Sequence, residues 1–271
     1  EKNREDLNYE IDGTVIKINN AALREKIGFR SRSPRWAVAA KFESKKLESQ
    51  VLEIVLQVGR SGAITPVAKI SPIFIGGARI QSVTLHNQDE IDRKEIHIKD
   101  YVIVERSGDV IPKIVSVIKG RRPLDAVKFT LQGAKCPSCN NPIKRIKNEA
   151  VYKCLNSNCK DQIKAQIEHF VSKKALNIDG LGPQIIDQLI NQKIIFTYAD
   201  IFKINQEDLI LLERFGEKSS ENLSESIENA KKTEFFRVLY GLGVPNVGEH
   251  IAKIIENHVN SSFEMLKKQT V

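Results

Sequence analysis

The four cysteines constrain what this chain can fold into more than any other feature of its sequence. They occur as C-x2-C, a 14-residue loop and C-x4-C, at Cys136, Cys139, Cys154 and Cys159. Two close pairs separated by a short loop are typical of a closed tetrahedral site in which four thiolates bind one Zn²⁺ ion. Two disulfide bonds are the alternative, but disulfides need an oxidising compartment and the sequence shows no signal peptide. The spacing therefore predicts a structural zinc site.

The zinc pattern divides the chain into two parts of different character. Segments before it are rich in β-branched residues that alternate with polar ones, and segments after it have helical periodicity. With 271 residues, 41% hydrophobic and 28% charged, the chain is typical of a globular protein with two to four compact units. No apolar run approaches the roughly 18 residues of a membrane span. We therefore expect a multidomain α+β fold with the zinc site at a junction.

The net charge of +8 is unevenly distributed along the chain. Residues 135–174 carry nine Lys and Arg against three Asp and Glu, whereas residues 175–271 carry ten against fourteen. The basic surplus around the zinc pattern suits a polyanionic partner such as nucleic acid. An ordinary solvated surface explains the charge almost as well.

The first 41 residues contain two short strand patterns that hold isolated basic residues. In the first, which ends at Ile18, polar and apolar residues alternate, so that Lys17 shares one face with Val15. The second begins at Pro34, and within its apolar run from Trp36 to Phe42, Lys41 is the only charged residue. An ammonium group there must reach solvent or a partner, because burying it unpaired is costly. The basic residues around Lys41 are typical of a phosphate-binding site. A plain basic loop explains them equally well.

The pattern of residues 42–131 favours a small β-barrel. Glycine-containing turns separate four β-rich segments, which are residues 51–58, 63–75, 78–85 and 101–117. Strands of this length in about 80 residues suggest a five-stranded barrel of the OB type, a fold that binds nucleic acid on one strand face.

Helical patterns follow the cysteines. Residues 161–176 have apolar side chains at helical spacing, and three related segments then repeat at intervals of roughly 30 residues. Each segment has a helix, a turn with glycine after an apolar residue, and a second helix; the glycines are Gly182, Gly216 and Gly248. Glycine lets backbone N–H groups at the start of the second helix approach a phosphate without positive charge. The glycines could merely cap helices, but the repeat favours helix-hairpin-helix units that bind the DNA backbone.

Several of these motifs together resemble bacterial NAD-dependent DNA ligases. Residues 10–17 (Glu-Ile-Asp-Gly-x-Val-x-Lys) and 31–42 (Ser-Arg-x-Pro-Arg-Trp-Ala-x-Ala-x-Lys-Phe) are similar to the last two nucleotidyltransferase motifs of that family. Residues 57–67, 84–87 and 106–112 are similar to its OB fold, which closes over nicked duplex DNA. The domains that the resemblance implies are the end of an adenylation domain, an OB fold, a four-cysteine zinc finger and three helical hairpins, at residues 1–43, 44–131, 132–160 and 161–271.

The resemblance also implies roles for individual residues. The family's adenylate pocket corresponds to Arg4, Asp12, Lys17 and Lys41, of which the last three are catalytic. The residues that contact DNA or the reacting phosphate correspond to Arg35, Arg60, Arg106, Gly182, Gly216 and Gly248. The chain departs from the family at Ala40, where an aromatic residue is usual.

The activity that the resemblance implies is the sealing of single-strand nicks in double-stranded DNA, in replication and repair. The reaction passes through enzyme–AMP and DNA–adenylate intermediates. NAD is then the AMP donor, Mg²⁺ assists the phosphoryl chemistry and Zn²⁺ is structural. The expected protein is a monomer of the bacterial cytoplasm, associated with the nucleoid, whose partner is nicked DNA and not a membrane.

One motif of that family is missing from these 271 residues. The adenylated lysine lies in Lys-x-Asp-Gly, but the two Ile-Asp-Gly sequences of this chain follow Glu10 and Asn177. We therefore expect the middle-to-late part of a longer enzyme, which cannot adenylate itself; a fourth hairpin and a BRCT module would follow it. One alternative is a non-catalytic module for duplex DNA, either a ligase remnant or half of a split protein. Another is an RNA-binding protein.

Overall fold

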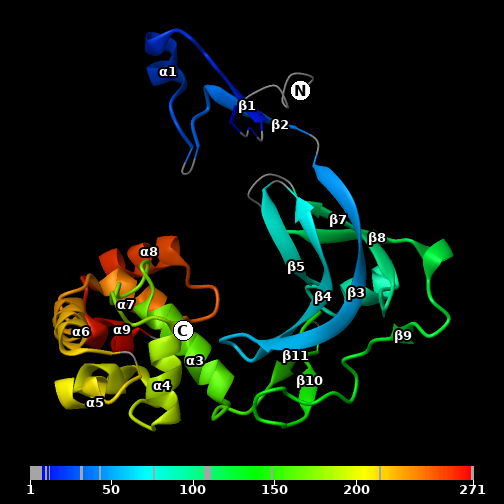
Figure 1. Cartoon of the computed structure of the whole chain (residues 1–271). Helices are drawn as coiled ribbons and strands as arrows, with labels where there is room; N and C mark the ends of the chain where they lie inside the picture. The colour runs from blue at the N-terminus through cyan, green and yellow to red at the C-terminus, as the bar shows by residue number, and fades with distance from the viewer. Residues whose placement is uncertain are drawn as a thin grey trace. The chain divides into compact units, whose positions relative to one another are not determined.

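In the computed structural model the chain forms two compact units. Figure 1 shows the helices and strands from which they are built. Unit 1 contains residues 1–55 and 66–130, and unit 2 contains residues 56–65 and 131–271. The strands β3 (Lys45–Val58) and β4 (Ala63–Ile75) pass from one unit into the other, so the tip of their hairpin belongs to unit 2. The residues that the structure describes are 8–9, 11, 13–30, 33–42, 44–75, 77–106, 111–147, 149–213 and 215–269.

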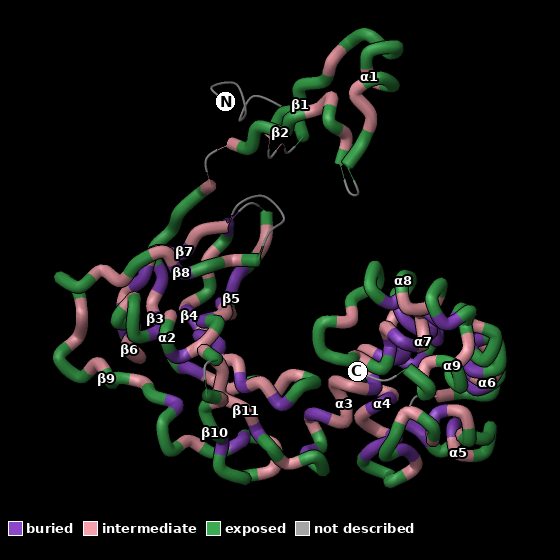
Figure 2. Tube along the Cα trace, turned by 180° about the vertical axis from the view of Figure 1, so that it is seen from behind, coloured by how far each residue is buried: buried purple, intermediate pink, exposed green. Residues whose placement is uncertain are grey.

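The N-terminal segment of unit 1 is a two-stranded ribbon with one short helix. Strands β1 (Gly13–Lys17) and β2 (Ala37–Lys41) pair antiparallel, and α1 (Ala21–Ile27) lies between them in the chain. A Cβ atom on Gly13 would lie 2.5 Å from the carbonyl oxygen of Ala40, so the close strand pairing requires glycine there. None of the described residues from 13 to 42 is buried, as Figure 2 shows in green and pink.

The rest of unit 1 is built on five antiparallel strands. Besides β3 and β4 these are β5 (Ala78–Thr84), β7 (Tyr101–Arg106) and β8 (Lys113–Val117). Along the sheet the order is β5, β4, β3, β7, β8, and β5 also contacts β8, which brings the two ends of the series together as in a small barrel. Pro72 lies where the register of β4 against β5 shifts, because proline has no N–H to donate to the ladder.

Alternating apolar residues of these strands fill the interior of unit 1. The buried cluster includes Val51, Ala68, Val83, Val102 and Val104, each of them at most 1% exposed. The helix α2 (Gln88–Lys94) packs Ile91 against this cluster. Short elements complete the unit: β6 (His97–Ile98), the 3-10 helix η1 (Lys119–Arg121) and β9 (Val127–Lys128).

A buried ion pair fixes the connection between β6 and β7. Asp100 is fully buried, and Arg122 reaches it with Nε at 2.7 Å from Oδ1 and Nη2 at 2.9 Å from Oδ2. The same carboxylate accepts the backbone N–H of His97 at 2.7 Å. A buried carboxylate is tolerated because both of its oxygens are bonded.

Unit 2 begins with the tip of the β3–β4 hairpin and a small cysteine-bearing ribbon. Strand β11 (Tyr152–Cys154) pairs with the start of β4, where Tyr152 lies opposite Ile64. Strand β10 (Ile143–Arg145) pairs with the other edge of β11.

Helices form the remainder of unit 2, in agreement with the helical periodicity of the sequence. They are α3 (Lys160–Val171), α4 (Pro183–Asn191), η2 (Tyr198–Lys203), α5 (Gln206–Ile210), α6 (Glu217–Ala230), α7 (Phe235–Gly241), α8 (Glu249–Val259) and α9 (Phe263–Lys268). Three successive pairs are in contact: α3 with α4, α5 with α6, and α7 with α8. One apolar cluster joins the first two pairs, and a second, built around Phe235, Phe236 and Ala252, joins the third pair.

Among the described residues, no helix is long and apolar enough to span a bilayer.

Candidate functional site

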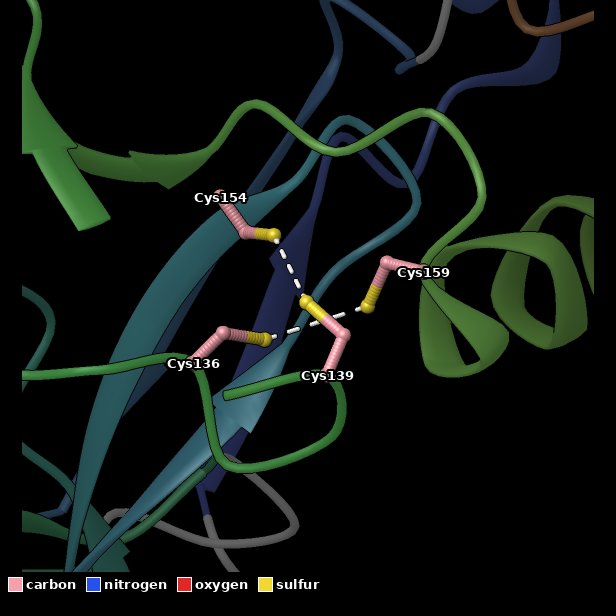
Figure 3. A group of neighbouring side chains, drawn as sticks. All are labelled: Cys136, Cys139, Cys154 and Cys159. Carbon is pink, nitrogen blue, oxygen red and sulfur yellow. Dashed lines mark hydrogen bonds between the residues drawn. The ribbon is translucent and has the colours of Figure 1, made fainter. Parts of the chain in front are cut away.

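The four cysteine sulfurs converge on one point of unit 2 (Figure 3). Sγ of Cys139 lies 3.5 Å from that of Cys154, Sγ of Cys136 lies 3.8 Å from that of Cys159, and all four fall within 4.8 Å of one another. A tetrahedron of sulfurs with Zn–S bonds of about 2.3 Å has edges of about 3.8 Å. Disulfide bonds would need sulfurs about 2.05 Å apart, so these thiols are unpaired. The donor set and its spacing fit one Zn²⁺.

The electrostatics of the cluster also suit a divalent cation. Burial raises the pKa of Cys136 to about 12 and raises the pKa of Cys154 as well. Hydrogen bonds from Asn156 and then Asn141 lower the pKa of Cys139, the least buried of the four, to about 6. Ionising all four thiols together is unfavourable unless a positive charge lies between them. A bound Zn²⁺ would supply that charge.

Three chain segments are tied together behind the cysteines. The N–H of Cys154 donates to the carbonyl of Gly62 at 2.9 Å. The side-chain amide of Gln162, only 7% exposed, donates to the carbonyl of Cys154 at 3.0 Å and to that of Asn156 at 3.2 Å. Gly62 has φ +78°, and a Cβ there would lie 2.3 Å from the Cys154 oxygen. Only glycine therefore lets the β3–β4 turn approach the zinc ribbon so closely.

The predicted adenylate-pocket residues are described in part. Lys17 lies opposite Ala37 and Lys41 lies opposite Gly13 in the β1–β2 ladder, so both lysines are exposed on the same face. They are four residue pairs apart, about 13 Å at a rise of about 3.3 Å per residue. Arg4 and Asp12 lie outside the described residues. The described part of the ribbon thus offers two cations on one face, and their roles stay predictions.

The three arginines predicted to contact DNA have different surroundings. Arg35 is exposed in the loop before β2, and Arg60 is exposed on the β3–β4 turn. Arg106 ends β7, is half-buried and donates from Nη1 to the carbonyl of Ile75 at 3.3 Å. The structure places Arg60 in unit 2 with the cysteines, whereas Arg35 and Arg106 belong to unit 1.

The three predicted hairpin glycines occupy equivalent positions. Gly182, Gly216 and Gly248 are the N-cap residues of α4, α6 and α8, the second helix of each contacting pair. Their φ angles are −81°, −95° and −81°, which any residue can adopt, and a Cβ at each would meet no atom within 4 Å. No side chain caps these three helices. Neither backbone strain nor internal packing therefore explains glycine, and no N-cap side chain accepts the first N–H groups of these helices.

Sequence reasoning missed the polar face of α3. From positions i, i+4 and i+7 of one helix, Gln162 lies beside Gly62 of the β3–β4 turn, Gln166 bonds the carbonyl of Arg60, and His169 lies near the charge of Arg60. Their spacing was visible, but polar residues at that spacing usually indicate a solvated face. No local signal connects them to a turn about a hundred residues earlier.

Comparison with protein families matches three parts of the chain. The model for the NAD-dependent DNA ligase adenylation domain matches residues 1–45, and that for the NAD-dependent DNA ligase OB-fold domain matches residues 48–126. The model for the NAD-dependent DNA ligase C4 zinc finger domain matches residues 135–160. The expected OB fold and four-cysteine finger are thereby confirmed.

Two curated relatives extend the similarity over the helices. The chain is 46% identical over 264 residues to a DNA ligase of Clostridioides difficile (strain 630), covering 97% of this chain and 39% of that protein. It is also 46% identical over 252 residues to a DNA ligase of Syntrophobacter fumaroxidans (strain DSM 10017 / MPOB), covering 93% and 37%. The chain thus spans about two fifths of the length of these relatives. Its domain matches and its relatives agree, and the chain belongs to the family of NAD-dependent DNA ligases.

Proposed function

We propose that this chain supplies the DNA-holding part of an enzyme that seals single-strand nicks in duplex DNA. The observation that carries the proposal is the set of three uncapped helix starts at Gly182, Gly216 and Gly248, each with open space where a side chain would be. Backbone N–H groups at such starts bind phosphate oxygens without reading sequence. This form of binding suits a helical region whose residues 175–271 carry a net negative charge.

In the same proposal, the other predicted site residues bind phosphate or DNA. Lys17 and Lys41 would bind phosphate oxygens from their common face of the ribbon, together with Asp12 and Arg4. Arg35, Arg60 and Arg106 would contact the DNA near the nick. NAD as AMP donor and Mg²⁺ as activator belong to the proposal through the family alone. Nicked duplex is the proposed partner, bound by a monomer.

Zinc has a structural role in the proposal. Cys136, Cys139, Cys154 and Cys159 would hold the ion, leaving no position for substrate. Because the same ribbon anchors the turn that carries Arg60, the ion would act on DNA binding only by fixing this geometry.

A first prediction concerns the hairpin glycines. In Gly182→Thr the new hydroxyl should cap α4 and occupy the space proposed for phosphate. Stability should change by no more than a few tenths of a kcal/mol. Affinity for a nicked duplex should fall about tenfold or more, because a hydrogen bond to a charged group contributes about 1.5–3 kcal/mol. Fluorescence anisotropy at fixed salt measures the affinity.

The matched control is Ser262→Thr, which changes the N-cap of α9 outside the three helix pairs. It should bind the duplex like the parent chain. Unchanged affinity in Gly182→Thr would show that the helix starts do not face DNA.

A second prediction concerns zinc. Cys154→Ser should release the ion and unfold residues 136–159, because metal binding and folding of such sites are coupled. Zinc content per chain should fall from one to near zero, and affinity for nicked DNA should weaken. Leu155→Ser is the control, since this neighbouring side chain is exposed. A Cys154→Ser chain that binds nicked DNA as tightly as the parent would contradict the structural role.

A third prediction distinguishes a ligase fragment from a non-catalytic DNA-binding module. The 271-residue chain incubated with NAD and Mg²⁺ should gain no AMP mass, because its sequence lacks Lys-x-Asp-Gly. Given a nick that already carries AMP on its 5′-phosphate, the chain should seal it, and Lys17→Ala and Lys41→Ala should slow the reaction. A stable AMP adduct on the chain would refute the first expectation.

The outcomes with the adenylated nick also discriminate the alternatives. Binding without sealing would favour a non-catalytic DNA module over a ligase fragment that retains the last step. Preference for single-stranded RNA over duplex DNA, compared at one salt concentration, would favour the RNA-binding alternative.

A further inference from the structure

The turn between β3 and β4 lies beside α3 (Figure 1) and is bonded to it. The side-chain amide of Gln166 donates to the carbonyl of Arg60 at 2.9 Å, although the two residues are 106 positions apart. One helical turn earlier, Gln162 Oε1 would lie 3.1 Å from a Cβ on Gly62. Within the turn, the N–H of Gly59 donates to Ala63 at 2.8 Å. The N–H of Cys154 also donates to the carbonyl of Gly62 at 2.9 Å. Hydrogen bonds therefore hold the backbone on both sides of Arg60 and at Arg60 itself.

The guanidinium group of Arg60 has a defined neighbour in unit 2. It lies beside Gly243, where a Cβ would come within 3.3 Å of Nη1 and 3.6 Å of Cζ. The same Cβ would lie 3.5 Å from Cδ2 of His169. Gly243 has φ +67° and belongs to the turn between α7 and α8, the third hairpin. The absence of a side chain there leaves room for the arginine against the hairpin backbone.

His169 is itself locked in place. Its Nε2 lies 2.9 Å from the carbonyl oxygen of Tyr240, and its ring centroid lies 4.8 Å from that of Tyr240. Burial lowers the pKa of His169, and the nearby charge of Arg60 lowers it further, although the bond to Tyr240 opposes both. A neutral imidazole at pH 7 can lie beside a guanidinium without repulsion.

The charge of Arg60 remains available for a ligand. The side chain is exposed, and none of the described carboxylates forms an ion pair with it. An unrestrained arginine side chain samples many rotamers, and binding must otherwise remove that conformational entropy. Holding the guanidinium in one place before binding reduces this cost.

We propose that Gln166, His169 and Gly243 are positioning residues that hold Arg60 beside the third hairpin, so that arginine and hairpin engage the DNA backbone together. This inference rests on the proposed function, in which Arg60 contacts DNA. These three residues, which we call the cradle, act through Arg60 and need not touch DNA themselves.

A double-mutant cycle tests the cradle on the full 271-residue chain. Affinity for a nicked duplex is measured over a series of salt concentrations for the parent, Arg60→Ala, Gln166→Ala, His169→Phe and the two double variants. Arg60→Ala should reduce the salt slope by about 0.9, the value for one phosphate contact. Each cradle variant should weaken binding about 3- to 10-fold, the range expected for losing the immobilisation of one side chain. In the Arg60→Ala background the cradle variants should have no further effect.

A control variant and a third cradle variant test whether loss of DNA affinity results from misfolding. Gln188→Ala removes a similar bond to backbone, because Gln188 accepts the N–H of Glu213 at 2.8 Å, and it should leave DNA affinity unchanged. Gly243→Asn introduces a residue that tolerates positive φ. Its side chain would occupy the space where the guanidinium group of Arg60 lies. It should weaken binding only when Arg60 is present.

Two other results would overturn the inference and are distinguishable. If Arg60→Ala weakens binding but the cradle variants are neutral, or weaken it equally in both backgrounds, the cradle does not act through Arg60 and the proposed function stands. If Arg60→Ala leaves affinity and salt slope unchanged, the inference fails together with the proposed DNA contact of Arg60.

Discussion

The hydrogen bond from the N–H of Cys154 to the carbonyl of Gly62 is the contact on which the arrangement of unit 2 depends. It joins the tip of a long β-hairpin to the cysteine ribbon at a distance that only glycine permits. Gln162 then bonds the same ribbon from the first helix. Strand, metal site and helix are therefore fixed at one place, with two of their backbone carbonyls satisfied by a single buried amide. A closed zinc site is well suited to this task, since it needs no large apolar core around it.

In the proposed function, unit 2 offers two kinds of group that would bind phosphate. Arg60 supplies a guanidinium, and the helix starts at Gly182, Gly216 and Gly248 supply backbone N–H groups. A guanidinium group attracts phosphate through its positive charge. Helix N–H groups donate hydrogen bonds to phosphate even where the surrounding surface is acidic. The proposal thereby accounts for how a region with net negative charge would hold a polyanion, because the proposed contacts are local and directional.

Much of this architecture was predictable because its signals are local. Cysteine spacing predicted the cluster of Cys136, Cys139, Cys154 and Cys159, and alternation of apolar residues predicted the strands of the barrel. The helix α2 was missed, although Asn87 followed three residues later by Glu90 is the start signal of a helix, and Asn87 does accept the N–H of Glu90.

The cradle around Arg60 was not predictable. The hydrogen bond from Gln166 to the carbonyl of Arg60 joins residues 106 positions apart. Neither a glutamine nor an arginine in a sequence indicates such a long-range contact. The sequence predicted that the glycines lie in turns, but not why each of the positions is occupied by glycine. Positive φ explains Gly62 and Gly243, whereas Gly182, Gly216 and Gly248 have ordinary φ angles and open space. Only the three-dimensional surroundings distinguish these two uses of glycine.

Hydrogen–deuterium exchange with and without a nicked duplex tests the central claim most directly. The first N–H groups of α4, α6 and α8, including those of Ile185, Ser219 and Ile251, have no partner within their helices and should exchange fast in the free chain. With DNA bound, exchange should slow at these three starts and at residues 59–62, while the start of α9 stays unchanged. Protection that is absent from the three helix starts, with the duplex shown to be bound, would contradict the account.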